Sequence, residues 1–348
     1  MKDSIGTWAP QWGLACIFAV ILCTQVAAQG FAGLGQGGEG FALPEPDPQF
    51  VFPQDHGPHP DYRIEWWYLT ASLQSGDGTR YGVQWTLFRS ALSPEGPQVW
   101  MGHFGVTTPE DHFSGEKLAR GGLGQAGVAA TPFSAWIDDW ELAGPTLDTL
   151  TLTSRTSEAG YDLDLRAQGP LVFHGADGFS VKSGSGQASY YYSQPFYEAA
   201  GVLSLPTGDV NVTGRAWLDR EWSSQPLDAD QEGWDWFSLH LDDGHRLMGF
   251  QLRGPQPYTY ASWITPDGHL TPYADGALRL TPLAQSRVAG RDVPTDWRLE
   301  LPAEGVDIEV RAVNPDSWQD TLFPYWEGPV TASGTHTADG YLEMTGYE

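Results

Sequence analysis

The sequence is poor in cysteine, in basic residues and in long apolar runs. Its two cysteines, Cys16 and Cys23, both lie within the first 28 residues. Lysine and arginine together number 18 against 44 aspartates and glutamates, so the formal net charge is −26. A surface of this charge repels nucleic acid and anionic lipid head groups, and we therefore exclude nucleic-acid binding. Beyond residue 28, no stretch is long and apolar enough to span a bilayer.

The N-terminus is typical of a cleaved secretory signal peptide, residues 1–28. Lys2 precedes an apolar stretch from Leu14 to Val26, and Val26-Ala27-Ala28 supplies the small residues of a cleavage site. Cleavage would leave a chain without thiols, so its stability must come from a packed core. We expect an exported, periplasmic protein that is not an integral membrane protein. An uncleaved N-terminal anchor is the alternative.

Aromatic residues and turn formers dominate the remainder of the chain. The sequence has 16 Trp, 14 Tyr and 15 Phe beside 42 Gly and 26 Pro, which favours strands over helices. Residues 29–49 are rich in Gly and then in Pro, as in a linker or an ordered arm. From Phe50 onward, short aromatic and β-branched runs alternate with Gly, Pro, Asp and Asn clusters. We predict an all-β protein whose helices are short and peripheral.

Two pairs of segments resemble each other in the same order along the chain. The hairpin pattern of 65–84, with its turn at Ser75–Gly78, returns in 234–251. The segment 197–214 likewise resembles 326–346. Two similarities in one order indicate a tandem duplication, although chance resemblance between aromatic hairpins is the alternative.

A duplicated antiparallel unit can close as a barrel or a sandwich. The many meandering strands and abundant aromatics favour two tandem lipocalin-like, calycin-type antiparallel β-barrels, a fold that often holds one small apolar ligand. We predict an N-terminal domain at 50–230 and a C-terminal domain at 231–348.

Seven sequence blocks carry a resemblance to a known family. They are "HGPHPDYRIEWWYLTASL", "YGVQWTLFR", "GRAWLDREWSS", "GWDWFSLHLDDG", "LMGFQLR", "YWEGPV" and "GYLEMTGY". The blocks resemble those of the AttH-like and carotenoid 1,2-hydratase family, in the same order and over nearly the whole chain after residue 56. The resemblance implies a pair of lipocalin-like domains. It also implies that some members add water to the terminal double bond of an acyclic carotenoid without a cofactor.

The hydratase chemistry needs an acid that can protonate an alkene and electron-rich surroundings for the resulting cation. A buried carboxyl keeps its proton near neutral pH, and aromatic faces stabilise a cation. The resemblance implies that Asp219 is the proton donor, that Trp217 stabilises the cation, and that Glu221 orients Asp219 or the water. This chain has Arg220-Glu221 where the hydratase pattern implies His-Asn.

The alternative for these carboxylates is structural. Asp219 and Glu221 could pair with arginines at a domain seam, such as Arg89, Arg215 or Arg253. The second copy of the repeat ends at "TGYE", so we also expect Trp217, Asp219 and Glu221 to lie in a segment without a counterpart.

Strand alternation divides the aromatic blocks between two faces. In "RIEWWY", Glu65, Trp67 and Leu69 share one face, and Trp66, Tyr68 and Thr70 share the other. One face should point into a barrel and the other toward the partner domain. Gln84 and Thr86 should point into the lumen or lie at a solvent-facing edge. The candidates for substrate binding are Trp66, Trp67, Tyr68, Gln84, Trp222, Trp234 and Trp236.

Other types of site lack their sequence signals. His56 and His59 have the spacing of a metal pair but no clear third ligand, so we predict no metal site. The chain has no Gly-x-Ser-x-Gly motif and no phosphate or dinucleotide loop, and we predict no cofactor.

Two functions remain open. The chain could bind an apolar isoprenoid or lipid and hydrate a terminal C=C bond by acid catalysis. It could instead be a non-catalytic carrier or chaperone of a hydrophobic ligand that is associated with a membrane transporter. The sequence does not predict the oligomeric state.

Overall fold

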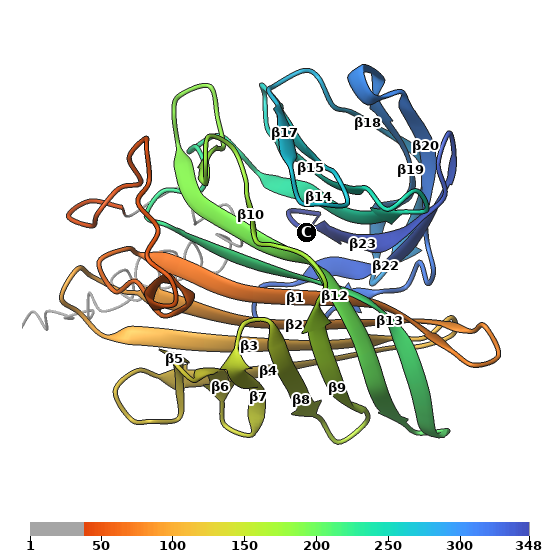
Figure 1. Cartoon of the computed structure of the whole chain (residues 1–348), viewed down its shortest axis with the longest axis horizontal. Helices are drawn as coiled ribbons and strands as arrows, with labels where there is room; N and C mark the ends of the chain where they lie inside the picture. The colour runs from red at the N-terminus through yellow and green to blue at the C-terminus, as the bar shows by residue number, and fades with distance from the viewer. Residues whose placement is uncertain (1–37, 348) are drawn as a thin grey trace, which may run out of the picture.

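The computed structural model describes residues 38–347 (Figure 1). The predicted signal peptide lies outside the described residues. Within them, the helical elements are two three-residue turns, η2 (Gln54–His56) and η3 (Pro302–Glu304), and antiparallel sheets make up the architecture. The all-β prediction is confirmed. No helix of the described range is long and apolar enough to cross a membrane.

The first sheet has 13 strands and curls into a nearly closed barrel (Figure 1). Its strand order is β4-β3-β2-β1-β13-β12-β9-β8-β7-β6-β5, and two short strands, β10 and β11, pair with β12. The strands are β1 (Ile64–Ser75), β2 (Arg80–Ala91), β3 (Gln98–Thr107), β4 (His112–Arg120), β5 (Ala126–Ala130), β6 (Phe133–Ile137), β7 (Trp140–Thr146), β8 (Thr149–Arg155), β9 (Gly160–Ala167), β10 (Val172–Phe173), β11 (Phe179–Val181), β12 (Ala188–Leu205) and β13 (Gly208–Ser223).

The second sheet has ten strands and forms a half-barrel. Its order is β17-β16-β15-β14-β23-β22-β20-β19-β18, and the short β21 pairs with β22. The strands are β14 (Gly233–Leu241), β15 (Arg246–Arg253), β16 (Tyr258–Ile264), β17 (Leu270–Tyr273), β18 (Arg279–Val288), β19 (Arg291–Leu301), β20 (Val306–Ala312), β21 (Trp318–Gln319), β22 (Tyr325–Gly334) and β23 (Ala338–Met344).

The two sheets repeat one connectivity around their central strands. The predicted hairpins are β1–β2 and β14–β15, and their turns lie at 76–79 and 242–245. The first strand of each hairpin also pairs with the last strand of its own sheet, β1 with β13 and β14 with β23. Each sheet thus has a central four-strand unit, β2-β1-β13-β12 or β15-β14-β23-β22.

The central strands of the first sheet are buried on both faces. One face of β1 and β13 places Trp67, Leu69, Leu218 and Trp222 in the barrel core. Many other large side chains, including Trp85, fill the same interior. As strand alternation predicts, the barrel is packed with side chains on the inward face.

The opposite face of these strands packs against the second sheet. We call this inter-sheet layer the seam. It is an apolar cluster of Tyr68, Val172, Tyr191, Phe196, Trp217, Leu227, Trp236, Met248, Phe250, Leu252, Tyr260, Ile264 and Tyr341. The sheets approach closely beside it, because Gly82 in β2 has no side chain. A Cβ at this position would lie 2.5 Å from Cδ of Pro329 in β22.

A buried ion-pair network lies at one end of the barrel, where β1 begins and β2 and β13 end. Glu65 is fully buried between Arg89 and Arg220, with its Oε2 3.2 Å from a guanidinium nitrogen of Arg220. Its carboxylate also accepts a hydrogen bond from the backbone N–H of His59 at 2.9 Å. The Arg220 guanidinium lies 3.9 Å from the ring centre of Trp67. Burial opposes the ionisation of Glu65, yet hydrogen bonding to His59 and the charges of Arg220 and Arg89 lower its pKa to about 2.

This network predicts a large stability loss when Glu65 is neutralised. Glu65→Gln leaves two buried guanidinium groups without their counter-charge, which should lower the free energy of unfolding by about 3 kcal/mol or more. The matched control is Asp292→Asn, which removes an exposed ion pair with Arg287 and should cost less than about 1 kcal/mol. Urea unfolding of both variants checks the difference, and equal losses would contradict it.

Candidate functional site

The candidate proton donor Asp219 lies in the seam and not in the barrel. It is 2% exposed and stands opposite Tyr68 in the pairing of β13 with β1. Three side chains donate hydrogen bonds to its carboxyl: the Ser193 hydroxyl and Trp217 Nε1, at 2.6 Å, to Oδ1, and the Tyr191 hydroxyl, at 2.8 Å, to Oδ2. These groups fix the position of the carboxyl, and all of them belong to the first sheet.

Asp219 has no arginine partner among the described residues, so the expected ion pair is wrong for this residue. Burial raises its pKa, the three hydrogen bonds oppose that rise, and the result is about 7. Glu221, on the same face of β13, does form an ion pair, but with Lys182 at 2.9 Å. The Lys182 ammonium also lies 4.7 Å from the ring centre of Tyr191. The two carboxylates therefore differ: Glu221 is paired and Asp219 is held by neutral donors.

The second sheet brings two further acids to the seam. Glu343 of β23 accepts a hydrogen bond from Trp234 Nε1 at 2.9 Å, and burial raises its pKa to about 7. Glu327 of β22 is fully buried and accepts a hydrogen bond from the Tyr68 hydroxyl. Burial and the nearby charge of Glu343 raise the pKa of Glu327 well above its usual range. Tyr68 of β1 thus links Glu327 of the second sheet to β13, the strand that pairs with β1 and carries Asp219.

These acids correct one expectation from the sequence. The strand β23 is the counterpart of β13 in the sheet order, and it too carries an acid to the seam. The idea that the Asp219 segment has no counterpart in the second copy was therefore wrong. Short motif similarities aligned "VTG" at 212–214 with "MTG" at 344–346, whereas the counterpart strand lies earlier, at Ala338–Met344. Strand pairing, and not motif spacing, determines which residues correspond.

The structure separates the predicted aromatic binders into two groups. Tyr68, Trp217 and Trp236 lie in the seam, with Trp66 and Trp234 partly buried at its margin. The ring centres of Tyr68 and Trp236 are 5.3 Å apart, across the two sheets. Trp67 and Trp222 belong instead to the barrel core. There Trp222 stacks on His59 with ring centres 3.8 Å apart, so neither of these two indoles reaches Asp219.

Gln84 occupies neither of its two expected positions. It is fully buried on the seam side of β2, where its amide donates to Thr86 and, at 3.4 Å, to the Tyr325 hydroxyl of β22. Its neighbour Trp85 points into the barrel core. The prediction of a lumen or edge position was wrong because the outer face of β2 is covered by the second sheet.

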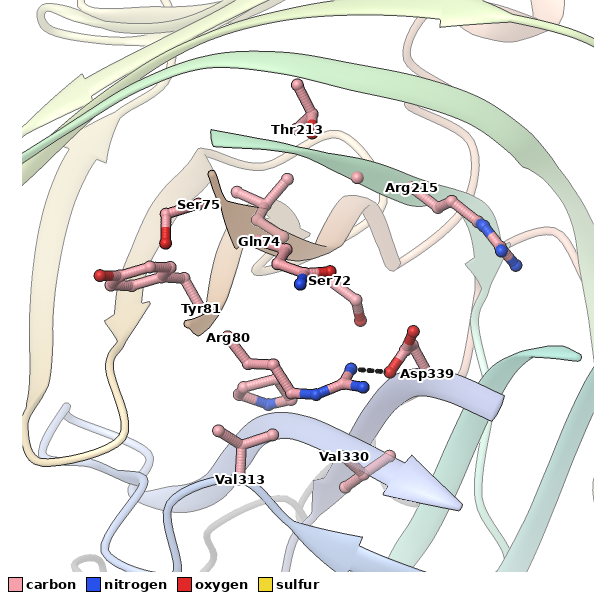
Figure 2. Close-up of a pocket in the computed structure, with 13 residues that line it drawn as sticks. Ser72, Gln74, Ser75, Arg80, Tyr81, Thr213, Arg215, Val313, Val330 and Asp339 are labelled. Atoms are coloured by element: carbon pink, nitrogen blue, oxygen red, sulfur yellow. Dashed lines mark hydrogen bonds and ion pairs between the residues drawn. The ribbon is translucent and has the colours of Figure 1, made fainter. Parts of the chain in front are cut away.

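One end of the seam opens into a polar groove of about 390 Å³ (Figure 2). Figure 2 shows Arg80 of β2 directed at Asp339 of β23, with which it forms an ion pair, while Ser72 and Arg215 contribute to the lining. Ser72 lies four residues beyond Tyr68 on β1, which corresponds to about 13 Å along the strand. The groove is therefore separate from the acids, and its lining does not suit an apolar ligand.

The two loop histidines have partners at the barrel end. Nδ1 of His59 lies 3.0 Å from Oε2 of Glu65, and Nδ1 of His56 lies 2.7 Å from the Tyr192 hydroxyl. Within residues 38–347, no group of three or more His, Cys, Asp or Glu side chains converges as a metal site.

Comparisons with known proteins assign the family. The AttH-like family model matches residues 43–347. The chain belongs to the AttH-like family. The crystal structure of a Nitrosomonas europaea protein assigned as AttH is 34% identical, with a TM-score of 0.81, and the match covers 88% of this chain and 100% of that one. The comparison with curated proteins gives no match.

Two more distant structures share the fold with this AttH-like protein. Kievitone hydratase from Nectria haematococca is 16% identical, with a TM-score of 0.65 and coverage of 88% of this chain and 96% of its own. CghA, solved with Sch210972, is 15% identical, with a TM-score of 0.57 and coverage of 90% and 98%. At these identities the likeness establishes the architecture alone.

The raised pKa of Asp219 predicts how the stability of this AttH-like protein depends on pH. In the unfolded chain Asp219 loses its proton near pH 3.8, whereas the folded protein keeps it to about pH 7. The folded state therefore binds more protons between these values, and stability falls as pH rises through this window. Asp219→Asn removes the titration and should reduce this fall by up to about 4 kcal/mol. Unfolding curves from low to neutral pH measure it, and an unchanged slope would refute the shift.

Proposed function

We propose that this protein is a cofactor-independent hydro-lyase that hydrates a carbon–carbon double bond of an apolar small molecule in the seam. The observation that carries the proposal is the environment of Asp219: a buried carboxyl whose pKa is raised to about 7, beside the aromatic rings of Trp217, Tyr68 and Trp236. A carboxylic acid that stays protonated near neutral pH in an apolar site can act as a general acid.

The reaction divides into two proton transfers. The Asp219 hydroxyl gives its proton to one alkene carbon, the π electrons form the new C–H bond, and the other carbon becomes cationic. The faces of the neighbouring aromatic rings stabilise this cation through their quadrupoles. Water then adds its oxygen to the cation and gives one proton to a carboxylate. One water molecule is consumed, and the proton count balances once the accepting carboxylate releases its proton to solvent and Asp219 regains one.

Glu343 is the proposed acceptor of the water proton. It approaches from the second sheet, and its pKa is raised to about 7, like that of Asp219. The charge of Asp219 raises the pKa of Glu343, so the pair holds one proton more readily than none. One protonated and one ionised acid is the arrangement that an acid–base pair needs near neutral pH. Glu221 is less suited to this role because Lys182 pairs with it.

The family and fold comparisons support a hydratase. The sequence blocks resemble those of carotenoid 1,2-hydratases, and one neighbour of the same fold is named kievitone hydratase. Lycopene and kievitone are therefore the first two compounds to test.

Asp219→Asn should abolish hydration and leave the fold intact. The amide is close in size to the carboxyl but cannot supply the proton, and loss of a general acid typically costs at least about 10²-fold in rate. Purified protein is incubated with lycopene or kievitone, and the gain of one water is followed by mass spectrometry. The control is Asp209→Asn, the same substitution at an exposed position of the same strand. Hydration at the normal rate by Asp219→Asn would reject Asp219 as the donor.

A carrier is the second proposed function, and one observation favours it. Three donors stabilise the ionised form of Asp219, as they would for a purely structural acceptor. In this case the seam would hold a hydrophobic ligand without converting it, and the protein could deliver that ligand to a membrane transporter after export. Native mass spectrometry of protein from its own host would then detect a co-purified lipid or isoprenoid, with no turnover of either test compound.

A further inference from the structure

A continuous chain of hydrogen-bonding side chains leads from Asp219 across the seam into the second sheet. Ser193 Oγ, which contacts the Asp219 carboxyl, lies 2.6 Å from Nε2 of His174. Nδ1 of the same imidazole lies 2.8 Å from the Ser262 hydroxyl of β16. Ser262 in turn lies 3.0 Å from the Tyr260 hydroxyl, which also accepts the backbone N–H of Gly175.

Every member of this chain is buried. His174, Ser193 and Ser262 are fully buried, and Tyr260 is 5% exposed. Burial and the nearby Lys182 lower the pKa of His174 well below its usual range, so the imidazole is neutral. A neutral imidazole donates from one nitrogen and accepts at the other. The two ring nitrogens of His174 therefore cannot both donate, and all hydrogen bonds along the chain must point the same way.

The state of Asp219 sets that direction. When Asp219 is ionised, Ser193 donates to it, Nε2–H donates to Ser193, and Nδ1 accepts from Ser262. When Asp219 is protonated on Oδ1, Ser193 accepts its proton and donates to Nε2, so the hydrogen of His174 must be on Nδ1 and point to Ser262. The protonation state of Asp219 thus determines which ring nitrogen of His174 carries the hydrogen.

We propose that Ser193, His174, Ser262 and Tyr260 form a relay that returns a proton to Asp219 after each turnover. Hydrogen moves one step along each link: from Ser193 to Asp219, from Nε2 to Ser193, from Ser262 to Nδ1, and from Tyr260 to Ser262. A proton from solvent water restores Tyr260. Four bonds to hydrogen break and four form within the chain, and the net result is one proton transferred from solvent to the carboxylate.

This inference rests on the proposed role of Asp219 and assigns positioning residues to it. The relay is built from both sheets, so it needs the seam and would be broken if the half-barrel were displaced. The charged and titratable groups that face its members are Lys182, Glu221, Glu343, Tyr68 and Tyr191. Of these, Lys182 and Glu221 pair with each other, the charge of Glu221 raises the pKa of Asp219, and that of Lys182 lowers the pKa of His174.

The test observes the tautomer of His174 directly and needs no substrate. The full chain is labelled with ¹⁵N-histidine, and the His174 signals among its nine histidines are assigned by their loss in His174→Gln. Nitrogen shifts are followed from about pH 5 to about pH 9, a range that brackets the Asp219 pKa of about 7. Infrared spectra of the carboxyl group follow Asp219 in the same samples.

We expect His174 to change from the Nδ1–H to the Nε2–H tautomer as pH rises, with the midpoint of the Asp219 titration. Asp219→Asn should hold it in the Nε2–H form throughout. Ser193→Ala should abolish the change while Asp219 still titrates, because the link is removed and the acid is not. Ser204→Ala is the control on the same strand, since the Ser204 hydroxyl accepts a hydrogen bond from Arg155 at the surface, away from the relay, and this variant should keep the change.

A fixed tautomer, or an imidazole that becomes doubly protonated in this range, while Asp219 titrates would overturn the relay. This result is distinguishable from failure of the proposed reaction. A coupled tautomer change without hydration of lycopene or kievitone supports the relay and counts against the hydratase. Hydration that depends on Asp219 with a fixed tautomer supports the hydratase and rejects the relay.

Discussion

The structure depends on the burial of both faces of its two central strands, β1 and β13. A strand places alternate residues on opposite faces, so each residue of these strands must suit either the barrel core or the seam. Leu218 and Trp222 pack in the barrel core, and Trp217 and Asp219 lie in the seam. A shift of one residue in register would exchange the two sets, placing Asp219 inside the barrel and Leu218 against the second sheet.

Because of this constraint, two adjacent charged residues of β13 are buried in different environments. Arg220 points into the barrel end, where Glu65 supplies the opposite charge and the ring of Trp67 covers the guanidinium. Asp219, the preceding residue, points the other way and accepts hydrogen bonds from the neutral side chains of Ser193, Tyr191 and Trp217. A buried pair keeps both its charges, whereas a buried single acid tends to keep its proton. One strand therefore carries a buried ion pair on one face and, on the other, a buried acid whose pKa is raised to about 7.

The strands, the hairpins and the two faces of "RIEWWY" could be predicted from the sequence, because strand alternation and turn residues are local signals. The family resemblance also made Asp219 a candidate site residue, which stays a prediction. The sequence could not identify Glu343 or Glu327, because each acid stands in a strand whose importance arises only from the docking of one sheet on the other. The position of Gln84 was missed for the same reason: a polar residue on an outer strand face is normally solvated, and here that face is covered.

The seam also explains why the two sheets, which share one connectivity, remain packed together. Each sheet alone would expose an acid on an aromatic surface, where water would ionise Asp219 or Glu343 near its ordinary pKa. Docking removes the water, raises both pKa values to about 7 and brings Ser262 of one sheet to His174 of the other. The same burial that costs stability at neutral pH thus creates the acid. A more stable seam, with both acids replaced by neutral side chains, would lose two groups whose pKa values burial raises to about 7.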